Sequence, residues 1–232
     1  MSTVLITGAN RGLGLEFTKQ YLKDGWKVFA CCRNPFNAKE LNELTKQFPD
    51  QLAIEGLDVS NHRLIDSLAN DLNGTPIEID VLINNSGVMG DKQNFGEIDY
   101  CEWEEVLRIN TFAPVKITEA LIKNLEKGKQ KKVINITSKM GSISDNTSGG
   151  HYLYRSSKVA LNMVTKSLSV DLKNKNITVV AIHPGWVVTD MGGPNALINA
   201  NKSVSSIKDL INKLSLEDSG KFLSYDGKEI EW

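Results

Sequence analysis

The 232-residue chain has few residues of the kinds that crosslink proteins or bind metals: three cysteines and three histidines. Cys31, Cys32 and Cys101 are too few and too unevenly spaced for a disulfide framework, and no C-x-x-C pair occurs. Because side chains alternate along a strand, the adjacent Cys31 and Cys32 should face opposite sides of a sheet. The histidines stand apart from one another, without the spacing of a metal site. We therefore expect a reducing compartment and no bound metal.

The chain also lacks an excess of charge and a long apolar run. Its formal net charge is −1 and its pI about 6.3, so no overall field favours nucleic acid or an anionic membrane. The basic run 127–132 is short and typical of a solvated loop. The apolar run after Met1 ends at Gly8, too early for a signal peptide or a transmembrane helix. These features predict a cytoplasmic protein with neither a nucleic-acid nor a membrane partner.

What the chain does contain is a regular alternation of short β-branched apolar runs with longer helical patterns. Its length and 41% apolar content suit one domain over residues 1–232. Strand-like runs occupy residues 3–7, 27–32, 52–57, 81–84, 132–137 and 178–183, with an edge strand expected at 221–225. Repeated βαβ units of this kind predict an α/β fold in which helices cover both faces of a parallel sheet.

The first turn, TGANRGLG at residues 7–14, directly follows the first strand and opens a helix predicted at 13–23. Glycines 8, 12 and 14 allow a tight turn, a close approach to a pyrophosphate, and helix amides aimed at it. The spacing is Gly-x-x-x-Gly-x-Gly rather than the GxGxxG of many two-domain dehydrogenases. A Gly-rich turn without a ligand is the alternative reading.

A tyrosine and a lysine lie four residues apart in YRSSK, at residues 154–158. On a helix this spacing puts both on one face, so the Lys158 ammonium should favour the phenolate and bring the pKa of Tyr154 toward the working range. Tyr154 would then act as a general acid and base. The alternative is an ordinary amphipathic helix with a core tyrosine and a solvated lysine. Tyr152 is a weaker candidate because Ser156, not a lysine, follows it by four.

Seven motifs, taken together, resemble the short-chain dehydrogenase/reductase family. They are TGANRGLG, LDVS at 57–60, NNSG at 84–87, RIN at 108–110, ITS at 136–138, YRSSK and PGWVVT at 184–189, in the family's order. The segment ACCRNP and the tail YDGKEIEW resemble the carbonyl reductase/sniffer and C-factor branch. This resemblance implies a single-domain Rossmann fold, doubly wound, with about seven parallel strands in the order 3-2-1-4-5-6-7 and helices on both faces.

The end of the second strand bears on the choice of nucleotide. An acidic residue there binds both adenosine ribose hydroxyls of NAD, whereas an arginine accommodates the 2′-phosphate of NADP. Here Arg33 occupies the strand end and Arg11 adds a second cation, so NADP(H) is favoured over NAD(H). An exposed Arg33 that accepts either cofactor is the alternative. The resemblance implies these cofactor-binding residues: Gly8, Asn10, Arg11, Gly12, Leu13, Gly14, Arg33, Asp58, Val59, Asn85, Ser86, Gly87, Tyr154, Lys158, Pro184, Gly185, Val187 and Thr189.

Two of the positions near these motifs have structural readings as well. In isolation Asp58 would be an ordinary N-cap for a helix beginning near Asn61, and Asn84 can tie neighbouring strands together. Small residues at 84–87 let the chain pass close to a cofactor, and the family's usual alanine is Ser86 here.

The catalytic residues implied by the resemblance are Asn110, Ser138, Tyr154 and Lys158. Ser138 would polarise a carbonyl oxygen, Tyr154 would protonate it, and Lys158 would lower the phenol pKa and hold the nicotinamide ribose. Asn110, within a helix predicted at 103–125, would distort that helix and hold a water for proton relay. The loop after Ser138, KMGSISDNTSGGHYL, should border the site.

Residues 190–216 are expected to form a substrate lid, with a helix near 204–214. The apolar helix after Tyr154 suits either a core helix or a subunit interface, compatible with a homodimer or homotetramer. The predicted activity is hydride transfer between nicotinamide and a small carbonyl or alcohol substrate. The alternatives are a C-factor-like nucleotide-binding signalling protein with incidental reductase activity and a 3-oxoacyl carrier protein reductase.

Overall fold

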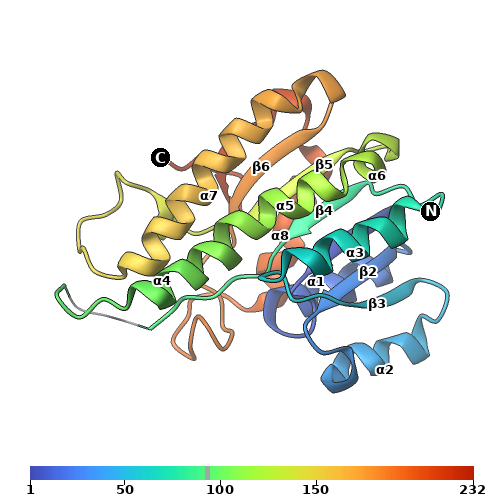
Figure 1. The fold of residues 1–232 in the computed structure, drawn as a ribbon, viewed down its shortest axis with the longest axis horizontal. Coiled ribbons are helices and arrows are strands. Elements are labelled where there is room, and N and C mark those ends of the chain that lie inside the picture. The colour runs from blue at the N-terminus through green and yellow to red at the C-terminus, as the bar shows by residue number, and fades with distance from the viewer. Residues whose placement is uncertain (92–94) are drawn as a thin grey trace.

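The computed structural model describes residues 1–91 and 95–232. Its strands are β1 (Thr3–Thr7), β2 (Lys27–Cys32), β3 (Leu52–Gly56), β4 (Val81–Asn84), β5 (Lys132–Ile136), β6 (Thr178–His183) and β7 (Phe222–Ser224). Its α-helices are α1 (Gly12–Lys23), α2 (Lys39–Gln47), α3 (His62–Asn73), α4 (Tyr100–Leu107), α5 (Ala113–Ala120), α6 (Ile122–Lys127), α7 (Tyr152–Asp171) and α8 (Ala200–Lys213). The order of elements follows the predicted alternation closely (Figure 1).

Within the described residues, the seven strands form one sheet in the order β3-β2-β1-β4-β5-β6-β7, and every pair of neighbours is parallel. The predicted strand order is therefore confirmed. β3 and β5 end one residue before their predicted ends, and β7 is shorter at both ends than the run 221–225. All carboxyl ends lie at one edge of the sheet, and the chain reverses its direction of winding between β1 and β4, where open sheets bind ligands.

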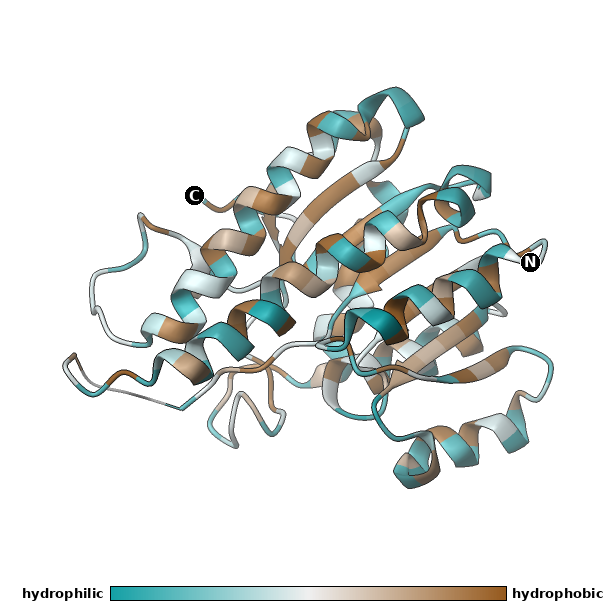
Figure 2. Ribbon diagram, in the orientation of Figure 1, coloured by the Kyte–Doolittle hydropathy of each residue, from teal (hydrophilic) through white to brown (hydrophobic). Residues whose placement is uncertain are grey.

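The core is divided by the sheet into two layers. Side chains of α1, α2 and α8 pack on one face, and those of α3, α5 and α6 pack on the other. Successive residues of a strand alternate between the layers. Figure 2 shows the central strands mostly in the apolar colour, as expected for a sheet covered on both faces. Cys31 lies in one layer and Cys32 in the other, which confirms the prediction that they face opposite sides. None of the described helices is long and apolar enough to cross a membrane.

The helix predicted at 103–125 is interrupted. After α4 the chain makes a π-helical turn, Arg108–Phe112, and then continues as α5 and α6. Pro114 has no N–H, so it cannot donate the hydrogen bond that an α-helix would bring to the carbonyl oxygen of Asn110. The break follows from this missing donor and from the side-chain contacts of Asn110 described below. Figure 1 shows α4 beside α7, with this broken helix crossing the face of the sheet.

Candidate active site

The Gly-rich turn, residues 7–14, is shaped by close contacts that only glycine permits. Gly8 has a φ of +65°. A Cβ on Gly14 would lie 2.1 Å from the carbonyl oxygen of Gly8, so a side chain at position 14 has no room. No side chain within the described chain caps the first amides of α1, because the N-cap residue, Arg11, makes no capping hydrogen bond. The turn therefore presents unfilled N–H donors at a helix start, the arrangement that binds phosphate.

The exit of β4 packs directly against this turn. Asn85 donates through Nδ2 to the carbonyl oxygens of Thr7 (2.9 Å) and Gly8 (3.2 Å). The Thr7 hydroxyl accepts from the backbone amides of Asn85 and Ser86, both at 3.0 Å. The Asn85 amide group is thus engaged in holding the Gly-rich turn in place. In the preceding strand, Asn84 donates to Asn135 Oδ1 at 2.8 Å, which confirms that it ties neighbouring strands together.

The exits of β2 and β3 flank the turn on its other side. Arg33 is exposed where β2 ends. The Asp58 carboxylate accepts from the amide and the hydroxyl of Ser60, at 3.0 and 2.8 Å. Asn61, not Asp58, is the N-cap of α3, so the N-cap reading of Asp58 is wrong. The Val59 side chain is buried in the core.

The segment after β6 reaches the Gly-rich turn from the opposite end of the sequence. A Cβ on Gly12 would lie 3.5 Å from the Thr189 methyl carbon, so these two predicted cofactor residues are neighbours. Arg11 forms an ion pair of 2.7 Å with Asp190, and both side chains are exposed. Gly185 has a φ of +86°, Val187 is buried, and the Pro184 carbonyl oxygen accepts from Ser203 of α8. The predicted cofactor positions therefore gather along one edge of the sheet.

Ser138, Tyr154 and Lys158 meet where β5 ends. Lys158 is buried, donates to the carbonyl oxygen of Ile136 at 3.0 Å, and lies 5.7 Å from the centroid of the Tyr154 ring. The Ser138 and Tyr154 side chains are also buried and hydrogen-bond each other. Ser138 Oγ additionally accepts from the Met140 amide at 3.1 Å. The three side chains predicted to do the chemistry are thus brought together from one strand end and one helix.

The pKa of Tyr154 is shifted in the direction opposite to the expected one. Burial raises the pKa of Tyr154, and the hydrogen bond from Ser138 lowers it only in part. The expectation that Lys158 brings this pKa down toward neutrality is wrong for the protein by itself. Burial also lowers the pKa of Lys158, to about 8, and its ammonium lies over the Tyr154 ring. At neutral pH the resting pair is a neutral phenol beside an ammonium.

Asn110 lies in the π-turn and is completely buried. Its Nδ2 donates to the Val88 carbonyl oxygen (2.7 Å) and to Ser157 Oγ (2.9 Å), and its Oδ1 accepts from the Val88 amide (2.9 Å). The side chain therefore joins the β4 exit to the second turn of α7. A Cβ on Gly87 would lie 3.3 Å from Asn110 Oδ1 and 3.5 Å from Lys158 Nζ, so a glycine keeps the space between these groups open.

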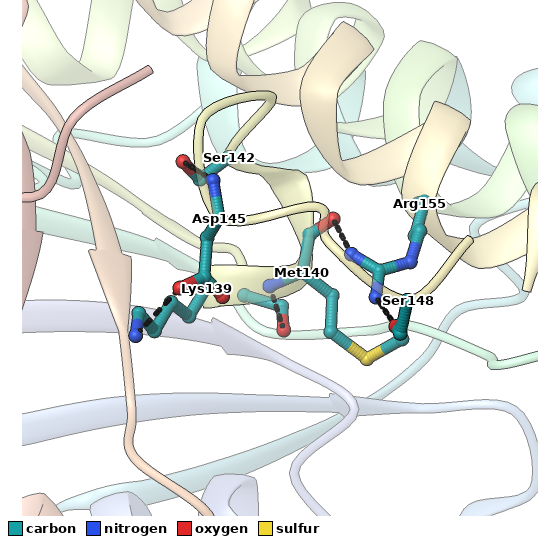
Figure 3. Close-up of polar contacts among 7 residues, drawn as sticks. Lys139, Met140, Ser142, Asp145, Ser148 and Arg155 are labelled. Carbon is teal, nitrogen blue, oxygen red and sulfur yellow. Dashed lines mark hydrogen bonds and ion pairs between the residues drawn. The ribbon is translucent and has the colours of Figure 1, made fainter. Parts of the chain in front are cut away.

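The loop after Ser138 is braced by polar contacts, drawn in Figure 3. Lys139 pairs with Asp145 at 2.8 Å, and the Asp145 amide donates to Ser142 Oγ at 3.2 Å. Arg155, next to Tyr154, donates to Ser148 Oγ at 3.0 Å and to the Met140 carbonyl oxygen at 3.5 Å. The loop predicted to border the site is thus tied to the helix that carries the tyrosine. The YRSSK motif drew attention to Tyr154 and Lys158 but not to the arginine between them.

Comparison with known proteins agrees with the architecture. The family model for short chain dehydrogenases matches residues 2–197. The chain is 44% identical over 154 residues to the C-signal of Myxococcus xanthus, covering 66% of this chain and 93% of that protein. It therefore belongs to the short-chain dehydrogenase family.

Two solved structures resemble it over their full length. The carbonyl reductase Sniffer of D. melanogaster superposes with a TM-score of 0.94 at 37% identity, covering all of both chains. An NADPH-bound carbonyl reductase from chicken fatty liver gives the same TM-score at 35% identity, covering 100% of this chain and 99% of that one. The predicted resemblance to the carbonyl reductase and C-factor branch is confirmed.

Proposed function

We propose that this protein is an NADP(H)-dependent carbonyl reductase in which Tyr154 is the general acid. The observation that carries the proposal is the buried cluster at the end of β5, in which Ser138 hydrogen-bonds Tyr154 and Lys158 lies over the tyrosine ring. A neutral phenol beside a serine hydroxyl can donate a proton to a carbonyl oxygen. Both similar structures named above are carbonyl reductases, which supports this direction of reaction.

The residues present fit NADP(H), the dinucleotide with a 2′-phosphate on its adenosine ribose. The uncapped start of α1 offers amides to a pyrophosphate. Arg33 is exposed at the β2 end, and Arg11 at the start of α1 adds a second cation for a 2′-phosphate. The related chicken enzyme is NADPH-bound. Bound NADPH would supply the hydride, with Lys158 at the nicotinamide ribose and the segment containing Val187 and Thr189 at the nicotinamide amide.

The protein's own groups would divide the remaining work. The Ser138 hydroxyl donates to the substrate oxygen and stabilises the negative charge that develops there. Tyr154 Oη transfers its proton to that oxygen, which yields the alcohol and leaves a phenolate. The Lys158 ammonium stabilises this phenolate by Coulomb attraction in a site of low dielectric. Because Pro114 has no N–H to give, the Asn110 carbonyl oxygen is the group we assign to the water that links Lys158 to solvent.

The substrate lid that we propose is shorter than the expected segment 190–216. α8 places Val204, Ile207 and Ile211 in the core, so it is part of the packed domain. Residues 190–199 are the part that we propose covers a substrate.

The exposed apolar side chains Met163 and Val170 on α7 are compatible with the homodimer or homotetramer that we propose.

Tyr154→Phe tests the catalytic assignment. It should bind NADPH as the unchanged protein does and lose about 10²- to 10⁴-fold in turnover, because only the hydroxyl proton is removed. Turnover within a factor of two of the unchanged protein would refute the role of Tyr154.

A separate titration tests the cofactor. NADPH and NADH are added to the protein while nicotinamide fluorescence is followed, with Arg33→Asp alongside. Tight NADPH binding that is lost in the variant would support the proposal, whereas equal or tighter NADH binding would overturn it.

A second candidate, nucleotide-dependent signalling with incidental reduction, is supported by the 44% identity to C-signal. One comparison of variants distinguishes the two candidate functions. If a biological output is lost when the nucleotide contacts are broken and is retained in Tyr154→Phe, signalling is the main function.

A further inference from the structure

A single buried amide connects the helix of Tyr154 to both sides of Ser138. Asn162 lies on α7, eight residues after Tyr154 and four after Lys158, so the three share one face of the helix. It is 1% exposed. Its Oδ1 accepts from the Thr137 hydroxyl at 2.8 Å, and its Nδ2 donates to the Gly141 carbonyl oxygen at 3.1 Å.

These two contacts bracket Ser138 along the chain. Thr137 immediately precedes it, and Gly141 ends the 3₁₀ turn Lys139–Gly141, whose N-cap is Ser138 itself. The turn also rests directly on α7, since a Cβ on Gly141 would lie 2.8 Å from the Lys158 carbonyl carbon. The serine backbone is therefore fixed to the helix from before and from after, with no space for it to shift inward.

We propose that Asn162 is a positioning residue that sets the placement of the Ser138 hydroxyl relative to Tyr154. The inference rests on the proposed function, because it assigns Asn162 a role in the same proton transfer. An asparagine suits this task because its side chain offers a donor and an acceptor at opposite sides of one planar group. Leucine would fill the volume but leave the Thr137 hydroxyl and the Gly141 carbonyl oxygen without these hydrogen bonds.

Loss of the hydrogen bonds that fix Ser138 should change the pKa of Tyr154, whereas a general loss of stability should not. Ser138 supplies the hydrogen bond that lowers the pKa of Tyr154 against the effect of burial. A charged group from the same helix, the Lys158 ammonium, lies over the Tyr154 ring. With the serine displaced, the pKa of Tyr154 should rise, so the pH at which turnover declines on the alkaline side should move upward.

The same helix and strand offer a matched control one turn away. Asn135 of β5 donates to the Thr165 hydroxyl of α7 at 2.9 Å, and both side chains are completely buried. Thr165→Val breaks this hydrogen bond between α7 and β5 without touching a neighbour of Ser138. It measures what the loss of a buried polar link does to stability alone.

The experiment compares Asn162→Leu, Thr165→Val and Tyr154→Phe with the unchanged protein. NADPH affinity, kcat and KM for 4-nitrobenzaldehyde are measured across pH. In parallel, NMR of protein carrying ¹³C at the tyrosine Cζ follows the Tyr154 resonance, identified by its absence in Tyr154→Phe, without any substrate. We expect Asn162→Leu to keep NADPH affinity, to lose about 10- to 100-fold in kcat, and to shift both pH curves upward. Thr165→Val should leave both curves in place.

Two further variants keep the test decisive if Asn162→Leu does not fold. Thr137→Val removes the hydroxyl that binds Asn162 and should shift the curves in the same direction. Asn162→Asp should recover turnover at acidic pH, where a protonated carboxyl group again offers one donor and one acceptor.

The outcomes separate this inference from the proposed function. If Asn162→Leu and Thr165→Val lower kcat equally and neither moves a pH curve, Asn162 is only structural and the inference is wrong. If Tyr154→Phe itself keeps its turnover, the proposed function fails instead.

Discussion

Replacing Lys158 with methionine should make the protein more stable at neutral pH while it destroys the proposed active site. Methionine is a similarly long apolar side chain, and the Lys158 ammonium group is buried and donates to the Ile136 carbonyl oxygen. Burial lowers the pKa of Lys158 from 10.5 to about 8, so the folded state disfavours its charged form. A shift of this size corresponds to roughly 3 kcal/mol of stability that the charged lysine removes.

The sign and the pH window follow from proton linkage. Between pH 8 and 10.5 the unfolded chain binds more protons at Lys158 than the folded protein does, so stability contributed by this group rises with pH. Below pH 8 the full destabilisation is present. Methionine removes it but leaves the Ile136 carbonyl oxygen without its donor, at a loss of about 1–2 kcal/mol.

We therefore expect Lys158→Met to be about 1–2 kcal/mol more stable than the unchanged protein at pH 7, and this advantage to be lost by pH 10, where the destabilisation by the charged lysine has fallen by about 2 kcal/mol. Urea unfolding at several pH values, at one protein concentration, measures both quantities. Lys166→Met, an exposed lysine on the same helix, is the control and should change stability by less than about 0.5 kcal/mol. A variant that is less stable at pH 7, or a difference that does not depend on pH, would refute the assignment of the lowered pKa to burial.

Three other substitutions test separate parts of the structure. Asp190→Asn removes the exposed anion that pairs with Arg11 and should tighten binding of 2′,5′-ADP, by up to about fivefold, but not that of 5′-AMP, in calorimetric titrations. Gly14→Ala forces a Cβ against the Gly8 carbonyl oxygen; thermal unfolding should show a loss of about 1–3 kcal/mol, and NADPH binding should weaken. Asp80→Ala removes the buried carboxylate that accepts from three backbone amides and should lower the free energy of unfolding by about 3 kcal/mol or more.

Arg33 and Arg11 show what the sequence can indicate about the cofactor and what it cannot. The positions of Arg33 after β2 and of Arg11 inside the Gly-rich turn indicate two cations for a 2′-phosphate. The structure adds that Arg11 already has an anionic partner, Asp190, from a segment 179 residues away. A phosphate that uses Arg11 has to share it with that carboxylate or displace it, which the sequence could not have indicated.

The sequence by itself determined the fold and the identity of the candidate site. Short β-branched apolar runs are local properties of the sequence, so the bounds of β1, β2, β4 and β6 could be predicted to the residue. Motifs at strand ends must converge because parallel strands end at one edge of the sheet, which is why Ser138 could be placed at a ligand site. Its grouping with Tyr154 and Lys158 came from the family resemblance. Even the break near Asn110 had a local signal, the proline four residues later, and the π-helical turn lies where the resemblance implied that Asn110 distorts the helix.

Tertiary structure decided what those residues can do. The sign of the Tyr154 pKa shift depends on burial by surrounding elements, which a spacing of four residues does not fix. Asn85 hydrogen-bonds the Gly-rich turn, and Asn162 hydrogen-bonds the residues on both sides of Ser138. Both sets of bonds depend on contacts between segments that are distant in the sequence. Periodicity reports which face of an element is buried, but hydrogen bonds and desolvation depend on which atoms of other elements meet that face.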